Sequence, residues 1–183
     1  MPTLGFGGLV VEDGTGLSNA ASYASLAEAE AYIKDMPLGV QTLWSTLDDD
    51  VKESLLIYAT RILDQRVRWH GSKAVPDSSL RWPRSYVVDR DELPVAADIV
   101  PLAVKAATAE LALWFSVDGR NPFTISDSQG IQAFTVDVIS ITYKADHDAT
   151  AVTSFPRGLN QILFGLGVFM SGGSGNFGVI SKA

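Results

Sequence analysis

Apolar side chains recur three and four residues apart in two stretches of the first half of the chain, each with a clear helix start. The first stretch opens at Ser25, which with Glu28 has the spacing of a capping box, and it stops at Pro37. The second opens in the acidic residues 48–50, and its apolar stripe consists of Val51, Leu55, Tyr58, Ala59, Ile62 and Leu63. Both stretches are predicted to be amphipathic helices.

Two further helices are predicted in the second half. One follows Asp98 with Pro101 in its first turn, ends at Gly119, and is expected to bury Ala103, Val104, Ala107, Leu111, Trp114 and Phe115. A shorter one ends at Gly165 or Gly167 and carries an apolar patch of Leu159, Ile162, Leu163 and Leu166. Between them, residues 130–144 are β-branched and alternate in polarity, which predicts a β-hairpin.

The remaining segments lack a helical or strand period. Residues 1–18 are rich in glycine and are interpreted as an extended arm, and residues 70–97 hold several prolines and aromatic residues and are interpreted as an ordered loop. We therefore expect a mainly α (α+β) fold, a small bundle of about four helices with a β-hairpin and extended N- and C-terminal arms. The expected organisation is an arm at 1–18, a helical domain at 19–168 and a flexible C-terminal arm at 169–183.

The last residues form a tethered apolar segment. A glycine- and serine-rich stretch at 171–175 precedes Phe177, Val179 and Ile180, which alternate like a short strand. Such a segment can add a strand to the sheet edge of another protein, and a disordered end is the alternative.

Composition narrows the class of protein. At 183 residues, with 46% hydrophobic and 19% charged residues, the chain suits one globular domain. It has no cysteine, so disulfides and thiolate chemistry are excluded. No secretion signal and no membrane-spanning run is read from the sequence.

The charge is unevenly distributed. The formal net charge is −7 with a pI of about 4.7, the wrong sign for a protein that mainly grips phosphate backbones. Residues 61–90 nevertheless hold seven basic side chains (Arg61, Arg66, Arg68, Lys73, Arg81, Arg84, Arg90) against three acidic ones (Asp64, Asp77, Asp89). This segment is either a nucleic-acid patch or, the reading we favour, the positive half of a contact with an identical subunit.

No convergent chemistry is found, so no catalytic, cofactor or metal residue is predicted. His70 and His147 stand in loops without carboxylates at metal-binding spacing, and no serine lies in a nucleophile elbow. The aspartates at 48–50 fan out around a helix start and are interpreted as capping residues. Asp89 and Asp91 are interpreted as salt-bridge partners of nearby arginines.

One string is distinctive enough to indicate a family. It runs through LRWPRS (80–85), VDRD (88–91), LPV (93–95) and on to Ile99, Pro101 and 103–104. Together with NAASYASLAEAEAY (19–32), ATRILD (59–64) and AELA (109–112), it resembles the head-tail connector adaptors of tailed bacteriophages, a family some of whose members are labelled DnaT-like. The likeness covers roughly residues 9–115 well.

The resemblance implies a structural protein of the virion neck and no enzymatic activity or cofactor. Copies, about twelve, would form a homo-oligomeric ring between the portal protein and the stopper or tail protein, with DNA only passing through the lumen during packaging and ejection. Synthesis in the bacterial host cytoplasm and no membrane contact are implied. Residues proposed to anchor the loop or to contact a neighbouring subunit are Trp69, Arg81, Trp82, Arg84 and Arg90, and the arm proposed to bind the portal carries Phe177, Val179 and Ile180.

The main alternative is a single-stranded DNA-binding module, in which exposed tryptophans would stack on bases beside arginines. Its platform would be formed by Arg66, Arg68, Trp69, Arg81, Trp82 and Arg84. For Trp82, plain core packing is a further alternative to a role in anchoring or subunit contact.

Overall fold

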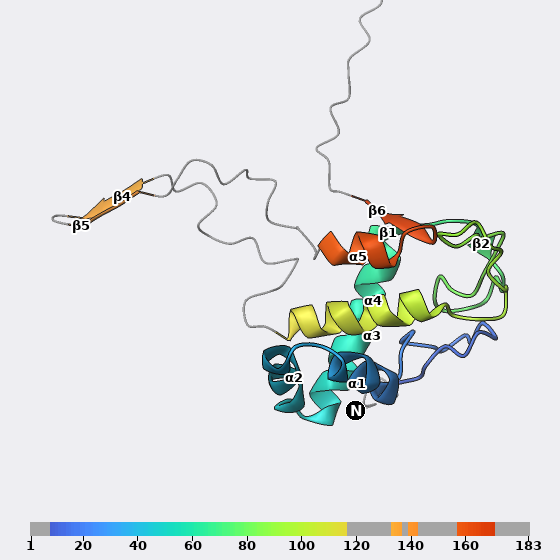
Figure 1. Ribbon diagram of the computed structural model, residues 1–183, viewed down its shortest axis with the longest axis horizontal. Coiled ribbons are helices and arrows are strands. Elements are labelled where there is room, and N and C mark those ends of the chain that lie inside the picture. Colours follow the sequence, from blue (N-terminus) through green and yellow to red (C-terminus); the bar gives the residue numbers. More distant parts are fainter. Residues whose placement is uncertain (1–7, 117–132, 137–138, 143–156, 171–183) are drawn as a thin grey trace, which may run out of the picture.

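The computed structural model describes residues 8–116, 133–136, 139–142 and 157–170. The fold is mainly helical (Figure 1). The helices are α1 (Leu26–Lys34), α2 (Leu38–Ser45), α3 (Asp49–Arg66), α4 (Leu102–Phe115) and α5 (Arg157–Ile162). The strands are β1 (Val67–Trp69), β2 (Ser72–Lys73), β3 (Arg84–Ser85), β4 (Ala133–Val136), β5 (Ile139–Thr142) and β6 (Gly167–Phe169). The expected α+β class is confirmed.

The core forms where α4 crosses α3 (Figure 1). Alanines such as Ala59 and Ala107 are buried at this crossing, and their small side chains allow the two backbones to approach closely. The fully buried leucine, isoleucine and valine side chains of the two helices are Leu56, Ile62, Leu63, Val104 and Leu111. This apolar burial is the main favourable term for the fold.

The buried stripe of α3 differs from the predicted one. Val51 is 44% exposed, whereas Leu56 and Thr60, outside the predicted stripe, are buried. Lys52 is buried as well, because its Nζ donates to Glu30 Oε1 of α1 over 2.9 Å. The packing of α1 therefore turns the face that holds residue 52 inward, which the apolar pattern alone does not indicate.

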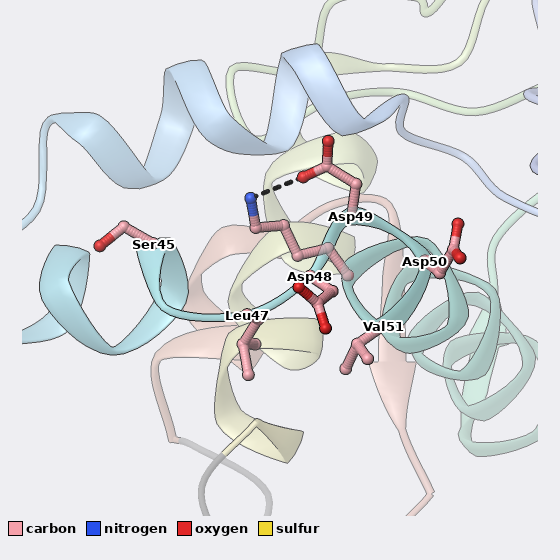
Figure 2. Close-up of a pocket in the computed structure, with 7 residues that line it drawn as sticks. Ser45, Leu47, Asp48, Asp49, Asp50 and Val51 are labelled. Carbon is pink, nitrogen blue, oxygen red and sulfur yellow. Dashed lines mark hydrogen bonds and ion pairs between the residues drawn. The ribbon is translucent and has the colours of Figure 1, made fainter.

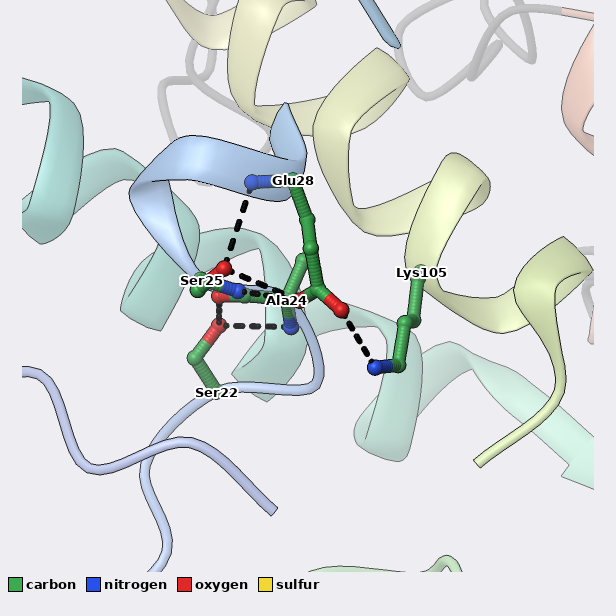
Figure 3. A network of polar contacts seen from close by, with 5 residues as sticks. All are labelled: Ser22, Ala24, Ser25, Glu28 and Lys105. Atoms are coloured by element: carbon green, nitrogen blue, oxygen red, sulfur yellow. Dashed lines mark hydrogen bonds and ion pairs between the residues drawn. The ribbon is translucent and has the colours of Figure 1, made fainter. Parts of the chain in front are cut away.

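Helix α1 has the predicted capping box (Figure 3). The Ser25 Oγ accepts from Glu28 N over 3.2 Å, and Ser25 N donates to Glu28 Oε2 over 2.8 Å. The second carboxylate oxygen of Glu28 accepts from Lys105 Nζ over 2.6 Å and so ties α1 to α4. Partial burial disfavours ionisation of Glu28, but the bonds from Lys105 and Ser25 outweigh it and lower its pKa.

Helix α2 was not predicted. It begins directly after Pro37 and buries one large side chain, Trp44. Pro37 therefore separates two helices instead of leading into a loop, in keeping with the tolerance of helix starts for proline.

Helix α4 begins at Leu102, with Pro101 in the N-cap position just before it. It contacts α1, α3 and α5, so it buries more than the one predicted face, including Thr108, Ala109 and Leu113. Trp114 and Phe115, expected on the buried face, are partly exposed. The helix ends at Phe115, and the predicted stop at Gly119 lies outside the described residues.

Three two-stranded antiparallel sheets complete the described part of the chain. Strands β4 and β5 form the predicted hairpin, with Ala133 opposite Thr142 and Val136 opposite Ile139. Strands β2 and β3 pair within the 70–97 loop. Strand β1, which continues α3 directly, pairs with β6 after α5, and this pairing was not predicted.

The N-terminal residues from 8 onward, expected to belong to an arm, are held against the domain. The Glu12 carboxylate is fully buried and accepts from the backbone N of Gly14, Gly16 and Leu17 over 2.8–2.9 Å. The Leu17 carbonyl oxygen in turn accepts from Ser79 N over 3.0 Å. The segment is thereby joined to the 70–97 loop.

Candidate functional site

The tryptophan- and arginine-bearing loop is attached to α3 through a carboxylate. Asp64 Oδ1 accepts from Tyr23 Oη over 2.5 Å and from Trp69 Nε1 over 3.2 Å, and Asp64 Oδ2 accepts from Arg81 N over 3.1 Å. The Tyr23 oxygen also accepts from the backbone N of Arg81 and Trp82, over 3.0 and 3.2 Å. Two polar side chains thus fix the 81–82 backbone beside the helix.

Burial changes the acidity of both groups. It raises the pKa of Asp64, although the bonds from Tyr23, Arg81 and Trp69 oppose the shift. Burial and the neighbouring Asp64 charge raise the pKa of Tyr23 well above its usual value. Tyr23 is therefore protonated at neutral pH and donates to the carboxylate.

The two tryptophans of the predicted interface are packed inside the chain. Trp82 is 0% exposed and Trp69 is buried, and their rings meet edge to face with centroids 5.8 Å apart. Trp69 also meets the Tyr23 ring edge to face at 6.5 Å. The Trp82 Nε1 is buried and has no hydrogen-bond partner among the described residues. Neither indole offers a face on which a base could stack.

Arg84 is also occupied within the loop. It is buried, and its guanidinium donates to the carbonyl oxygens of His70, Gly71 and Arg81 over 2.6, 2.7 and 3.0 Å. Burial lowers its pKa, yet an arginine stays charged under such conditions. Its role here is to join the β1–β2 turn to β3.

Four of the five other arginines of the basic segment face outward, and Arg66 is half-buried. Arg61, Arg68, Arg81 and Arg90 are exposed, and the ion pairs found among the described residues involve only Lys52 and Lys105. The expected pairing of Asp89 and Asp91 with nearby arginines is therefore wrong. Asp89 Oδ1 instead accepts from the backbone N of Asp91 and of Leu93, each over 2.9 Å, because a turn follows it immediately.

An apolar surface lies beside these arginines at the end of α3. In the β1–β6 pair, Arg68 stands opposite Val168, and both are exposed. Met170 and Phe164 are exposed as well, and Gly165 packs against the backbone N of Arg90. We call this the β1–β6 surface: Arg68, Arg90, Phe164, Val168 and Met170. Sequence reasoning missed it, although the short apolar run 168–170 after Gly167 is compatible with a strand.

The opposite end of α3 is acidic (Figure 2). A hollow there is lined by Ser45, Leu47, Asp48, Asp49, Asp50, Val51 and Lys52. All three aspartates are exposed, and Asp49 pairs with Lys52 over 2.9 Å, whereas Asp48 and Asp50 form no ion pair among the described residues. Asp48 occupies the N-cap position, but its side chain makes no capping hydrogen bond, so the expected capping is correct in position only. We call Leu47, Asp48, Asp50 and Val51 the α3 acidic end.

The remaining candidates have simple surroundings. His70 Nδ1 lies 2.8 Å from the Gly165 carbonyl oxygen, and His147 is outside the described residues, as are Phe177, Val179 and Ile180. Within the part of the chain that the structure describes, no three His, Cys, Asp or Glu side chains are grouped to hold a metal ion. None of the described helices is long and apolar enough to cross a membrane.

The fold and these surfaces define a small, mainly helical α+β domain with an acidic end and a basic, apolar end. Residues 8–181 match a family model described as "Putative DnaT-like ssDNA binding protein", and the chain belongs to this family. Searches of the curated proteins and of the solved structures found no match.

Proposed function

We propose that this chain is the adaptor subunit of a tailed bacteriophage neck, a ring-forming structural protein that joins the portal to the stopper or tail and lets DNA pass through its lumen. The proposal rests mainly on one observation: the side chains of the segment at residues 67–90 divide into a buried set and an exposed set. Its tryptophans and Arg84 hold the segment in place, while Arg68, Arg90 and exposed apolar side chains face outward. An ordered scaffold that presents such side chains suits contact with protein.

The exposed large apolar side chains support a role in assembly. They include Leu38, Leu43, Val51, Tyr86, Val88, Leu93, Ile99, Leu102, Phe164, Val168 and Met170. Single exposed apolar residues are normal, but groups of them next to unpaired charges are typical of interaction surfaces. The resemblance of residues 9–115 to phage adaptors supports the identity of the partners.

The acidic balance of the chain supports passage of DNA rather than tight binding. With a net charge of −7, a ring of these subunits carries a negative field that repels phosphates. DNA can then slide through the lumen without being held.

A second candidate function is binding of single-stranded DNA, which the family description names. It is favoured by the exposed Arg61, Arg68, Arg81 and Arg90 and by Tyr86, which is 92% exposed. The burial of Trp69 and Trp82 counts against it, since the predicted platform needs both indole faces. Tyr86 remains as an exposed aromatic side chain for stacking.

The two functions differ in a direct experiment. The purified chain is analysed by native mass spectrometry and negative-stain microscopy, alone and with a co-expressed portal protein. The adaptor predicts a ring-sized species or a portal-bound ring. The same preparation is titrated into a fluorescent oligo-dT at rising salt, with Tyr86→Ala as the matched variant. A chain that stays monomeric with portal and binds the oligonucleotide at physiological salt, with Tyr86→Ala weakening that binding, contradicts the proposal.

A further inference from the structure

We infer that the β1–β6 surface of one copy docks on the α3 acidic end of a second copy, so that copies associate head to tail. This inference rests on the proposed function, because a ring needs one contact that repeats between identical subunits. Beyond the proposed function, the inference names the two surfaces that form this contact and says which surface of one copy meets which surface of the next.

The first argument is the unpartnered face of the β1–β6 pair. Val67, Trp69 and Gly167 point into the core and are buried, whereas Val168 on the other face is 57% exposed. Met170 follows two residues later and is exposed on the same side of the strand. Phe164, 63% exposed, directly precedes Gly165 and Leu166, whose carbonyl oxygens are hydrogen-bonded to His70 at the end of β1. An apolar face therefore lies open beside two arginines.

The second argument is the make-up of the α3 acidic end. Figure 2 shows Leu47, Asp48 and Val51 on one side of the helix start, while Asp49 turns toward Lys52. Asp48 and Asp50 form no ion pair within the described residues. This end thus combines partly exposed apolar side chains with Asp48 beside them and Asp50 on the other side of the helix start, all lining one hollow (Figure 2).

The two surfaces complement each other in charge. Pairing them brings Arg68 and Arg90 to Asp48 and Asp50 and covers apolar side chains on both sides. Pairing either surface with its own copy about a two-fold axis would place like charges together, which is unfavourable. Charge therefore selects a contact between unlike surfaces.

The positions of the two surfaces allow the same contact to form again between each copy and the next. They lie at opposite ends of α3 (Figure 1), a helix of 18 residues that spans about 27 Å. One copy cannot join its own two ends across that distance. Each copy instead offers one surface to the neighbour before it and the other to the neighbour after it, which produces a ring when the rotation closes.

Cysteine trapping tests the contact, since the chain contains no cysteine of its own. The double variant Val51→Cys/Val168→Cys is oxidised and run on a non-reducing gel. Head-to-tail docking predicts a ladder of dimers, trimers and higher species, whereas either single variant gives no species larger than a dimer. The matched control is Asp77→Cys/Asp98→Cys, two exposed positions outside both surfaces, which is expected to give no ladder. A double variant that stops at dimers overturns the inference.

Charge reversal gives a second, independent readout. Asp48→Lys/Asp50→Lys and Arg68→Glu/Arg90→Glu, each in the cysteine double variant, are expected to lose the ladder when alone and to recover it when mixed in equal amounts. Circular dichroism and thermal unfolding confirm that each variant is folded. Docking through these charges is contradicted if neither reversal affects the ladder. It is also contradicted if the ladder does not return when the two folded variants are mixed.

Cysteine trapping and the portal-binding experiment together distinguish an error in the two surfaces from an error in the proposed function. If the chain forms portal-bound rings but the trapping ladder is absent, the adaptor role stands and the two surfaces are wrong. If neither rings nor ladder form, both are wrong.

Discussion

At the scale of single residues, Asp64 is the side chain on which the placement of the 70–97 loop most depends. It accepts hydrogen bonds from Tyr23, Trp69 and Arg81, which come from three separate parts of the sequence. Without it the Tyr23 hydroxyl and Trp69 Nε1 would lose their acceptor in partly buried surroundings, and Arg81 N would keep only Tyr23 Oη. A single carboxylate therefore joins the N-terminal segment, β1 and the loop.

Removing this acceptor is expected to cost stability. Asp64→Ala leaves the Tyr23 hydroxyl and Trp69 Nε1 without their acceptor, whereas Arg81 N keeps Tyr23 Oη, and we expect the free energy of unfolding to fall by about 3 kcal/mol. Urea unfolding followed by tryptophan fluorescence measures it. Asp77→Ala, an exposed aspartate in the same loop, is the control and should change the value by less than about 0.5 kcal/mol. Equal effects of the two substitutions would show that the network does not hold the loop.

The raised pKa of Asp64 predicts a pH dependence. Because burial raises the pKa of the folded chain above the ordinary 3.8, folding takes up a proton between the two pKa values. The contribution of Asp64 to stability is therefore greatest below pH 3.8 and is lost as the pH rises through the folded pKa. The side chain in the Asp64→Asn variant does not titrate. The free energy of unfolding of the wild type, relative to that of this variant, should therefore decrease as the pH rises over that interval. Urea unfolding at a series of pH values measures it, and a difference independent of pH refutes the shift.

At the scale of elements, the turn between α5 and β6 sets the β1–β6 surface. Gly165 has φ of +88°, and a Cβ there would lie 2.8 Å from the backbone N of Arg90. Only glycine accepts both the conformation and the close approach without strain. The turn carries the chain from α5 back along β1, so Phe164 and Val168 are displayed on either side of it.

A pair of glycine substitutions tests this turn. Gly165→Ala is expected to lower the free energy of unfolding by about 2 kcal/mol through backbone strain and the contact with residue 90. Gly158→Ala is the matched control, because a Cβ at that helical position meets nothing within 4 Å. It should leave stability unchanged or raise it by about 0.5 kcal/mol. Thermal unfolding of both variants gives the comparison, and a neutral Gly165→Ala would argue against the turn geometry.

Elements with a strong local signal could be predicted from the sequence. The capping box at Ser25 gave α1, the apolar period after residue 48 gave α3, and the alternation within 130–144 gave the β4–β5 hairpin. What failed depends on contacts distant in sequence. Strand β1 is three residues long and is defined by pairing with β6, about a hundred residues later in the chain.

In the candidate site, too, local sequence signals identified residues, but contacts distant in sequence decided where their side chains lie. Sequence reasoning selected Trp69, Trp82 and Arg84 as important, but it could not decide whether they face a partner or the core. That choice is made by Asp64 and Tyr23, whose roles no local pattern reveals. The buried Lys52 and the missing Asp48 cap likewise depend on the neighbouring α1 and on side-chain rotamers.

At the scale of the whole molecule, the segment 171–183 is predicted to attach the domain to its partner. Its alternating Phe177, Val179 and Ile180 follow a glycine- and serine-rich stretch, a composition that suits strand addition to another protein. Deleting 171–183 should abolish portal attachment in a pull-down while the circular dichroism spectrum stays folded. The triple variant Phe177→Ser/Val179→Ser/Ile180→Ser should have the same effect, because the tether alone provides no apolar contact. Attachment that survives both changes refutes the role of the arm.

The separation of charge along α3 predicts how assembly responds to salt. Arg68 and Arg90 stand at one end and Asp48 and Asp50 at the other, so a head-to-tail contact gains part of its stability from exposed opposite charges. Raising the salt from about 50 mM to about 500 mM shortens the screening length several-fold, and the sedimentation coefficient of the assembled protein should fall toward that of the monomer. The loss should be incomplete, since burial of Phe164, Val168 and Met170 is not screened. The control Asp77→Lys/Asp98→Lys should follow the wild type, whereas Arg68→Glu/Arg90→Glu should sediment as a monomer at the low salt concentration, where the repulsion between like charges is least screened. Assembly that strengthens steadily with salt would mean that the apolar side chains alone hold the subunits and that the arginines serve another purpose, of which contact with DNA is the first to test.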